Sequence, residues 1–178
     1  MVVIDTAKGD QNRPDFVAIN PMRQVPALRL PDGSVMTESA AIVIHLADAF
    51  PGKGLAPKPA TPAHAQFLRW MFFMAANLYE GDLRHFYPDR YTTDPAGIDG
   101  VKSAAAAHMK KSFAVVEDAL SRSPYLCGPD LTMADAYLAM LMMWSPEPLK
   151  SPRLLAVRAA VATDPTIAPL WRRHGFQA

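Results

Sequence analysis

The stretch of residues 20–46 constrains the fold most, because it reads as a loop, a strand, a tight turn, a returning strand and a helix. Asp32-Gly33 separates two short apolar runs and tolerates the positive φ that a hairpin turn requires. Residues 37–39 then open a helix that Pro51-Gly52 ends. The sequence therefore predicts a β-hairpin that leads directly into a helix.

Two features of this stretch go beyond packing. Val25-Pro26 precedes the first strand, and proline there marks a strand start or a turn because it has no N–H for the ladder. Spacing alone does not predict a cis bond, since most X-Pro bonds are trans. Glu38-Ser39 stands at a helix start, where free N–H groups and the helix dipole favour an anion. A simpler interpretation stays open, in which Ser39 or Thr37 is only an N-cap.

Taken together, Asn20-Pro21, residues 24–28, the hairpin and residues 38–42 resemble the glutathione-binding half of the bacterial-type cytosolic glutathione transferases. The resemblance implies that Pro26 is cis and that the backbone of Val25 pairs with the cysteinyl part of glutathione. It also implies that Glu38 and Ser39 hold the γ-glutamyl end. Gln24, assisted by Arg23, is expected to reach the glycyl end, with an ordinary exposed loop as the alternative.

Residues 51–59 are rich in proline and glycine, and everything beyond them reads as helical. We therefore expect an α+β, mostly α chain. Its predicted domains are a thioredoxin-like, glutathione-binding domain in residues 1–56 and an all-helical domain in residues 57–178. The likeness to the transferases extends over nearly the whole chain.

The helical half carries clear start signals. Predicted helix starts lie at Thr61-Pro62, Asp94-Pro95, Ser151-Pro152 and residues 163–165. Thr132 and Asp135 form a capping box, which explains the carboxylate of Asp135 without any catalytic role. An apolar stripe at spacings of three and four marks the first of these helices as a core or subunit-interface helix, through Phe67, Trp70, Met71, Met74 and Leu78.

Several large side chains of the helical half are candidates for an acceptor pocket: Met74, Tyr79 and Trp144, together with Tyr87, Tyr91 and Tyr137. Burial in the core is the competing and simpler interpretation for each. Cys127 lies in a loop ahead of a helix start, a position that can activate a thiol, but structural burial explains it more simply.

Composition excludes several classes of function. A formal net charge of +1 gives no electrostatic case for nucleic acid or an anionic membrane. The single Cys127 cannot form an intrachain disulfide framework, which fits the cytoplasm. No apolar run approaches the ~20 residues of a membrane span, and we find no Cys/His spacing typical of a metal site.

Members of the family begin with a strand and a helix that precede the segment matched here, and the loop between them carries a catalytic Tyr, Ser or Cys. The chain is therefore expected to begin at the second strand, with residues 2–4 as that strand and without the usual thiolate-stabilising donor. We expect residues 2–6 to pair with an unexpected partner or to be poorly ordered. Pairing of residues 2–5 with residues 27–30 is the second choice.

Two functions follow from the resemblance. The first is a homodimeric glutathione transferase that conjugates glutathione, as co-substrate and without a metal, to a small hydrophobic electrophile. The second is a non-catalytic binding or interaction protein with the same fold. A thiol-disulfide oxidoreductase is disfavoured, because the Val25-Pro26 loop has no nearby cysteine.

Overall fold

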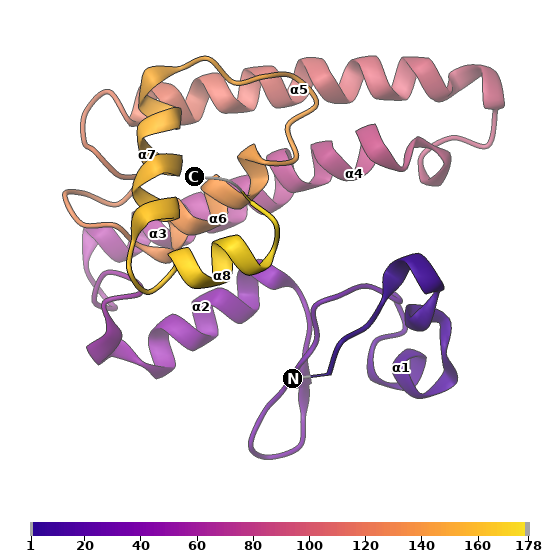
Figure 1. Cartoon of the computed structure of the whole chain (residues 1–178), viewed down its shortest axis with the longest axis horizontal. Coiled ribbons are helices and arrows are strands. Elements are labelled where there is room, and N and C mark those ends of the chain that lie inside the picture. Colours follow the sequence, from indigo (N-terminus) through magenta and orange to yellow (C-terminus); the bar gives the residue numbers. More distant parts are fainter. Residues whose placement is uncertain (1, 177–178) are drawn as a thin grey trace. The chain divides into compact units, whose positions relative to one another are not determined.

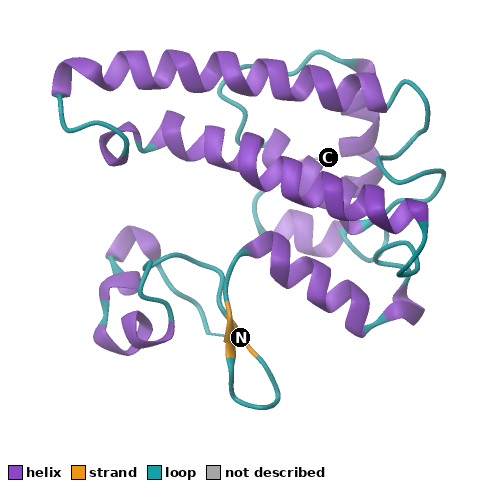
Figure 2. Cartoon of the chain, turned by 180° about the vertical axis from the view of Figure 1, so that it is seen from behind, coloured by secondary structure: helices purple, strands orange, loops and turns teal. Residues whose placement is uncertain are grey.

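The computed structural model describes residues 2–176, and the chain forms two compact units, residues 1–49 and residues 50–178. Helices make up most of the second unit, and the only strands among the described residues are the two of a short hairpin in the first unit (Figures 1 and 2). None of the helices in residues 2–176 has the length and apolar character needed to cross a membrane.

The predicted strand at residues 2–4 is wrong. Val2 and Val3 have no regular secondary structure and are 85% and 75% exposed. The next residues turn instead, because Asp5 Oδ1 accepts hydrogen bonds from the N–H groups of Ala7 and Lys8. The pairing of residues 2–5 with residues 27–30 is likewise absent from the described sheet. Short helical elements follow: η1 (Thr6–Lys8), η2 (Asp10–Asn12) and α1 (Pro14–Ile19).

The predicted hairpin is confirmed. Strands β1 (Leu28–Arg29) and β2 (Val35–Met36) are antiparallel, with Leu28 opposite Met36. Its turn has Gly33 at a φ of 87°, a conformation that favours glycine. Asp32 Oδ1 accepts from the N–H of Ser34 at 2.9 Å and thereby closes the turn. Helix α2 (Ser39–Ala49) follows at once, as predicted.

The second unit opens with a long helical run that changes type in its middle. Helix α3 (Pro62–Phe73) passes into a π-helical segment, η4 (Met74–Tyr79), and then into α4 (Glu80–Phe86). Thr61 caps α3 by accepting from the N–H of His64, as predicted. The predicted apolar stripe is confirmed as core, because Phe67, Trp70, Met71, Met74 and Leu78 are all buried. The π-helical segment was not predicted.

Helix α5 (Ile98–Ala119) runs side by side with α4 (Figure 1). Gly81, which has no side chain, allows α4 and α5 to pack in close contact. A Cβ at Gly81 would lie 2.4 Å from Cγ of Met109, which is buried on α5. The other short elements of this half are η3 (Pro51–Lys53), η5 (Pro88–Arg90) and η6 (Pro95–Gly97).

Three more helices complete the unit: α6 (Met133–Met142), α7 (Pro152–Thr163) and α8 (Ala168–Arg173). The start of α7 after Ser151 is confirmed, but α8 begins later than the predicted residues 163–165. The side chain of Asp164 accepts from the N–H groups of Thr166 and Ile167, so the chain makes a turn there before the helix. Trp171 of α8 then packs with Ala139, Val161 and Ala162.

The compact units divide between Ala49 and Phe50, ahead of the predicted boundary between residues 56 and 57. The segment after α2 is tied to the helical unit, since the N–H of Met133 donates to the carbonyl of Leu55 at 2.8 Å. The assignment of functional domains to residues 1–56 and 57–178 stays a prediction.

Candidate functional site

The loop ahead of β1 is organised by one buried side chain. Asn20 is 4% exposed, and its Nδ2 donates to the carbonyl of Gln24 at 2.8 Å. Its Oδ1 accepts from the N–H of Met22 at 3.1 Å. Arg23 between these contacts has a φ of 57°, which a non-glycine residue rarely adopts. The loop is therefore held in a defined turn, with the side chains of residues 21–26 exposed.

The Val25-Pro26 peptide bond is cis, as the resemblance implied. Proline has no N–H for a sheet ladder, so the regular pairing begins only at Leu28. Val25 stands just ahead of the hairpin, exposed to solvent.

The start of α2 has an unusual backbone. Glu38 adopts a φ of 66°, and its carbonyl accepts from the N–H of Ile42 at 2.9 Å. Non-glycine residues in the left-handed region cost free energy, and such residues concentrate at functional sites. Glu38 is exposed and Ser39 is half-buried. By helix geometry, the first N–H groups of α2 have no acceptor within the helix, so they can bind an anion.

The hairpin register brings the two segments together. Leu28 pairs with Met36, and Pro26 lies two residues before Leu28 while Glu38 lies two residues after Met36. Both segments therefore leave the hairpin at its open end. The cis peptide and the helix start are separate in sequence, but they flank the same end of one small sheet.

An aromatic cavity lies in the helical unit. It has a volume of about 340 Å³ and is lined by Tyr79, Asp82, Leu83, Phe86, Tyr87 and Trp144. The Tyr79 and Trp144 rings lie 5.9 Å apart between centroids, at an angle of 39°. Three candidates for an acceptor pocket, Tyr79, Tyr87 and Trp144, thus line one cavity. Met74 does not line it because its side chain is fully buried, and Tyr137 is also buried in the core.

Sequence reasoning missed three residues of this cavity, Leu83, Phe86 and Asp82, of which Asp82 is the one carboxylic acid. Its side chain is 4% exposed, and neither carboxylate oxygen has a hydrogen-bond partner among the described residues. Burial raises the pKa of Asp82 to about 7. The sequence does contain a signal for this buried carboxylate. Asp82 follows Leu78 by four positions, so it occupies a position of the apolar stripe of the helix.

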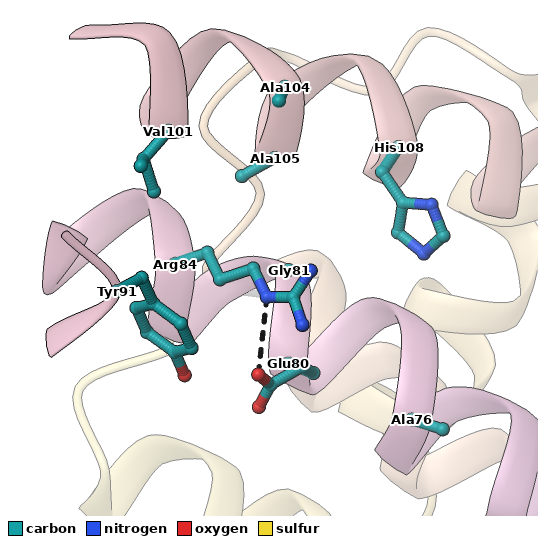
Figure 3. A pocket seen from close by; sticks show the side chains of 9 residues that line it. All are labelled: Ala76, Glu80, Gly81, Arg84, Tyr91, Val101, Ala104, Ala105 and His108. Carbon is teal, nitrogen blue, oxygen red and sulfur yellow. Dashed lines mark hydrogen bonds and ion pairs between the residues drawn. The ribbon is translucent and has the colours of Figure 1, made fainter. Parts of the chain in front are cut away.

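A second cavity, of about 350 Å³, lies between α4 and α5 (Figure 3). Arg84 Nε donates to Glu80 Oε1 at 3.2 Å, and the guanidinium lies 5.4 Å from the Tyr91 ring centre. Burial and then the Glu80 carboxylate raise the pKa of Tyr91. His108 Nε2 lies 3.2 Å from Asn77 Oδ1. Glu80 and Arg84 of this cavity therefore pair with each other, whereas His108 contacts Asn77 beside it.

The capping box at α6 is confirmed. Asp135 is fully buried, and Oδ2 accepts from both the N–H and the hydroxyl of Thr132, at 2.8 and 2.9 Å. Burial raises the pKa of Asp135, whereas these hydrogen bonds act in the opposite direction. Burial likewise raises the pKa of the nearby Cys127 thiol to about 11, so this thiol is not an activated nucleophile.

No group of three or more His, Cys, Asp or Glu side chains within residues 2–176 could hold a metal ion. Neither the loop of Val25 nor the aromatic cavity therefore has a metal cluster within the part of the chain described. What the open end of the hairpin offers a ligand is the backbone of Val25, the Glu38 carboxylate and the start of α2.

Residues 1–49 match the family model described as "Glutathione S-transferase, N-terminal domain". The chain is 33% identical over 135 residues to Glutathione S-transferase GstA of Escherichia coli O157:H7, covering 76% of the chain and 64% of that protein. It is 32% identical over 152 residues to Glutathione S-transferase 3 of Zea mays, covering 79% of the chain and 64% of that protein. The chain thus spans just under two thirds of the length of these relatives.

Solved structures point to the same family as these sequence relatives. A glutathione transferase homolog from Sulfitobacter, solved with bound glutathione, superposes with a TM-score of 0.87 at 26% identity, covering 99% of the chain and 86% of that protein. BphK, a bacterial GST solved as a ternary complex, superposes with a TM-score of 0.79 at 30% identity, covering 91% of the chain and 80% of that protein. The predicted fold class, a thioredoxin-like part followed by an all-helical part, is confirmed. The chain belongs to the glutathione S-transferase family.

Proposed function

We propose that the protein binds glutathione at the open end of the hairpin, through Gln24, Val25, Pro26, Glu38 and Ser39. The observation that carries the proposal is the common location of the cis Val25-Pro26 peptide and the α2 start at that end. A second support is the Sulfitobacter relative, which was solved with bound glutathione.

The chemistry of glutathione suits these groups. A tripeptide needs backbone donors and acceptors, and the main chain of the exposed residue Val25 would offer them to its cysteinyl part. Its γ-glutamyl end carries a carboxylate and an ammonium group. The first N–H groups of α2 and the Ser39 hydroxyl suit the carboxylate. The Glu38 carboxylate suits the ammonium group, and Gln24 with Arg23 suits the glycyl carboxylate.

We further propose that the bound glutathione is a co-substrate, transferred to a small hydrophobic electrophile. The thiolate sulfur would form a bond to an electrophilic carbon as a halide leaves. Tyr79 and Trp144 are the proposed acceptor-binding residues, since both line an aromatic cavity of the size that small ligands occupy. Homodimer formation, supported by Phe72 with 64% exposure on α3, and a cytoplasmic location belong to the same proposal.

The binding proposal is tested by retention of the full chain on immobilised glutathione. We expect the wild type to be retained and the double variant Glu38→Ala, Ser39→Ala to pass through with unchanged helical content. The matched control is Asp118→Ala, Ser121→Ala, which removes an exposed acid and hydroxyl from the other unit and should be retained. Retention of the Glu38, Ser39 double variant would show that the anchoring role is wrong.

Turnover separates transfer from binding alone. We expect the wild type to release chloride from chlorodinitrobenzene in the presence of glutathione. Retention on glutathione without this release would favour the non-catalytic alternative. Size-exclusion chromatography tests the homodimer, and a monomeric elution volume at micromolar concentration would contradict it.

A further inference from the structure

We propose that the aromatic cavity selects ligands that carry a protonated amine next to a small apolar body, with the Asp82 carboxylate as their counter-ion. The inference rests on the proposed role of this cavity as the acceptor pocket and names the chemical class that it takes. It starts from a difference in hydrogen bonding between two buried aspartates of the same unit.

Asp82 and Asp135 are both almost fully buried, but they differ in what they contact. Asp135 accepts three hydrogen bonds, from the N–H of Leu126 and from the N–H and hydroxyl of Thr132. Asp82 accepts none from the described residues, although it lines a cavity. A buried carboxylate without donors is costly, so Asp135 is explained by structure and Asp82 is not.

The two arginines closest to Asp82 in the sequence contact other side chains. Arg84, two residues on, donates to Glu80 and lies against the Tyr91 ring in the other cavity. Arg90 lies 4.2 Å above the centre of the Tyr87 ring. Burial is the cause of the raised pKa of Asp82, with no charged neighbour contributing to the shift. The ionised carboxylate therefore has no hydrogen-bond partner among the described residues, which leaves it available to a cationic ligand.

The remaining lining residues suit the body of such a ligand. Tyr79, Phe86, Tyr87 and Trp144 contribute aromatic rings, whose faces attract a cation as well as apolar carbon. A volume of about 340 Å³ lies at the lower end of the range for small-molecule sites. A single-ring amine fits this size.

Helical spacing along α4 explains how Asp82 joins this cavity. Tyr79 directly precedes this helix, and Asp82, Leu83 and Phe86 follow Tyr79 by three, four and seven positions, so they share one face. Leu78 stays in the core, while Tyr79 and Asp82 line the cavity.

Binding of such a cationic ligand should release a proton from the protein. Near neutral pH, Asp82 carries a proton in a large fraction of molecules, because its pKa is about 7. A bound ammonium group favours the carboxylate form and lowers this pKa, so the protein releases a proton as the cation binds. A neutral ligand of the same shape has no such effect.

The experiment is calorimetric titration of the full chain at pH 7 with benzylammonium and with benzyl alcohol, its uncharged counterpart. We expect benzylammonium to bind the wild type about tenfold or more tighter than Asp82→Asn, the effect of losing a hydrogen bond to a charged group. Proton release, measured in buffers of different ionisation enthalpy, should accompany binding to the wild type only. Benzyl alcohol should bind both proteins equally.

The control variant is Glu80→Gln, which neutralises a neighbouring acid that lines the other cavity. It should bind benzylammonium as the wild type does. Equal affinity of benzylammonium for wild type and Asp82→Asn would overturn the proposal, as would an equal loss for benzyl alcohol or no binding to the wild type. Retention of Asp82→Asn on immobilised glutathione keeps this outcome distinct from failure of the glutathione proposal.

Discussion

The main-chain N–H of Leu126 donates to Oδ1 of Asp135 at 2.9 Å, which ties the loop ahead of α6 to the first turn of that helix. The other carboxylate oxygen accepts from Thr132. One fully buried side chain thus satisfies donors on both sides of the helix start.

Asp135→Ala should lower the free energy of unfolding by about 3 kcal/mol, because it removes the cap and leaves buried N–H groups unsatisfied. Asp99→Ala, an exposed acid in the first turn of α5, is the matched control and should change it by less than about 1 kcal/mol. Urea denaturation measures both. Equal effects of the two changes would contradict a structural role for Asp135.

Gly81→Ala should destabilise the protein by about 1 to 3 kcal/mol, although alanine is the better helix former. The added Cβ would overlap Cγ of Met109, which is buried between α4 and α5. Gly100→Ala on α5 meets no atom within 4 Å, so it should raise stability by up to about 1 kcal/mol. Thermal denaturation should show a lower midpoint for Gly81→Ala and a higher midpoint for Gly100→Ala. A stabilising Gly81→Ala would show that α4 and α5 are not in close contact at this position.

Elements with a local cause could be predicted from the sequence. The hairpin depends on Asp32-Gly33, whose turn closes through contacts between neighbouring residues. The starts of α3 and α6 depend on Thr61 and on the pair Thr132 and Asp135, again within a few residues. The residue pairs proposed for the glutathione site, Val25-Pro26 and Glu38-Ser39, stand out from the pattern of one short stretch, and their binding role stays a prediction.

Elements that depend on distant or competing contacts could not be predicted. Val2 and Val3 have strand-like side chains, but Asp5 draws the following N–H groups into a turn. Asp82 stands in an apolar stripe, where the sequence does not tell whether a carboxylate meets a donor. Its lack of one depends in part on Trp144, which follows the end of the distant helix α6.

The stability of the wild type relative to Asp82→Asn should fall as pH rises from about 4 to about 7. The folded protein holds the pKa of Asp82 at about 7, above its unfolded value near 3.8, so folding favours the protonated form. That advantage is present at low pH and is lost as the group ionises in the folded state. After allowance for solvent screening, the relative change should be about 2 kcal/mol.

Urea denaturation of both proteins at pH 4, 5, 6, 7 and 8 measures this difference, and other titrating groups cancel in the comparison. The midpoint of Asp82→Asn should exceed that of the wild type most at pH 8. A constant difference across the range would show that Asp82 titrates as an ordinary exposed aspartate.

Asn20 should control glutathione affinity without touching the tripeptide, because its side chain positions the loop that carries Val25. Asn20→Asp keeps the acceptor for the N–H of Met22 but removes the donor to the carbonyl of Gln24. We expect about three- to tenfold weaker binding of glutathione, the effect of one lost hydrogen bond. Asn12→Ala, an exposed asparagine of the same unit, should bind as the wild type does. Calorimetric titration with glutathione measures all three, and unchanged affinity of Asn20→Asp would mean that the geometry of this loop does not matter for binding.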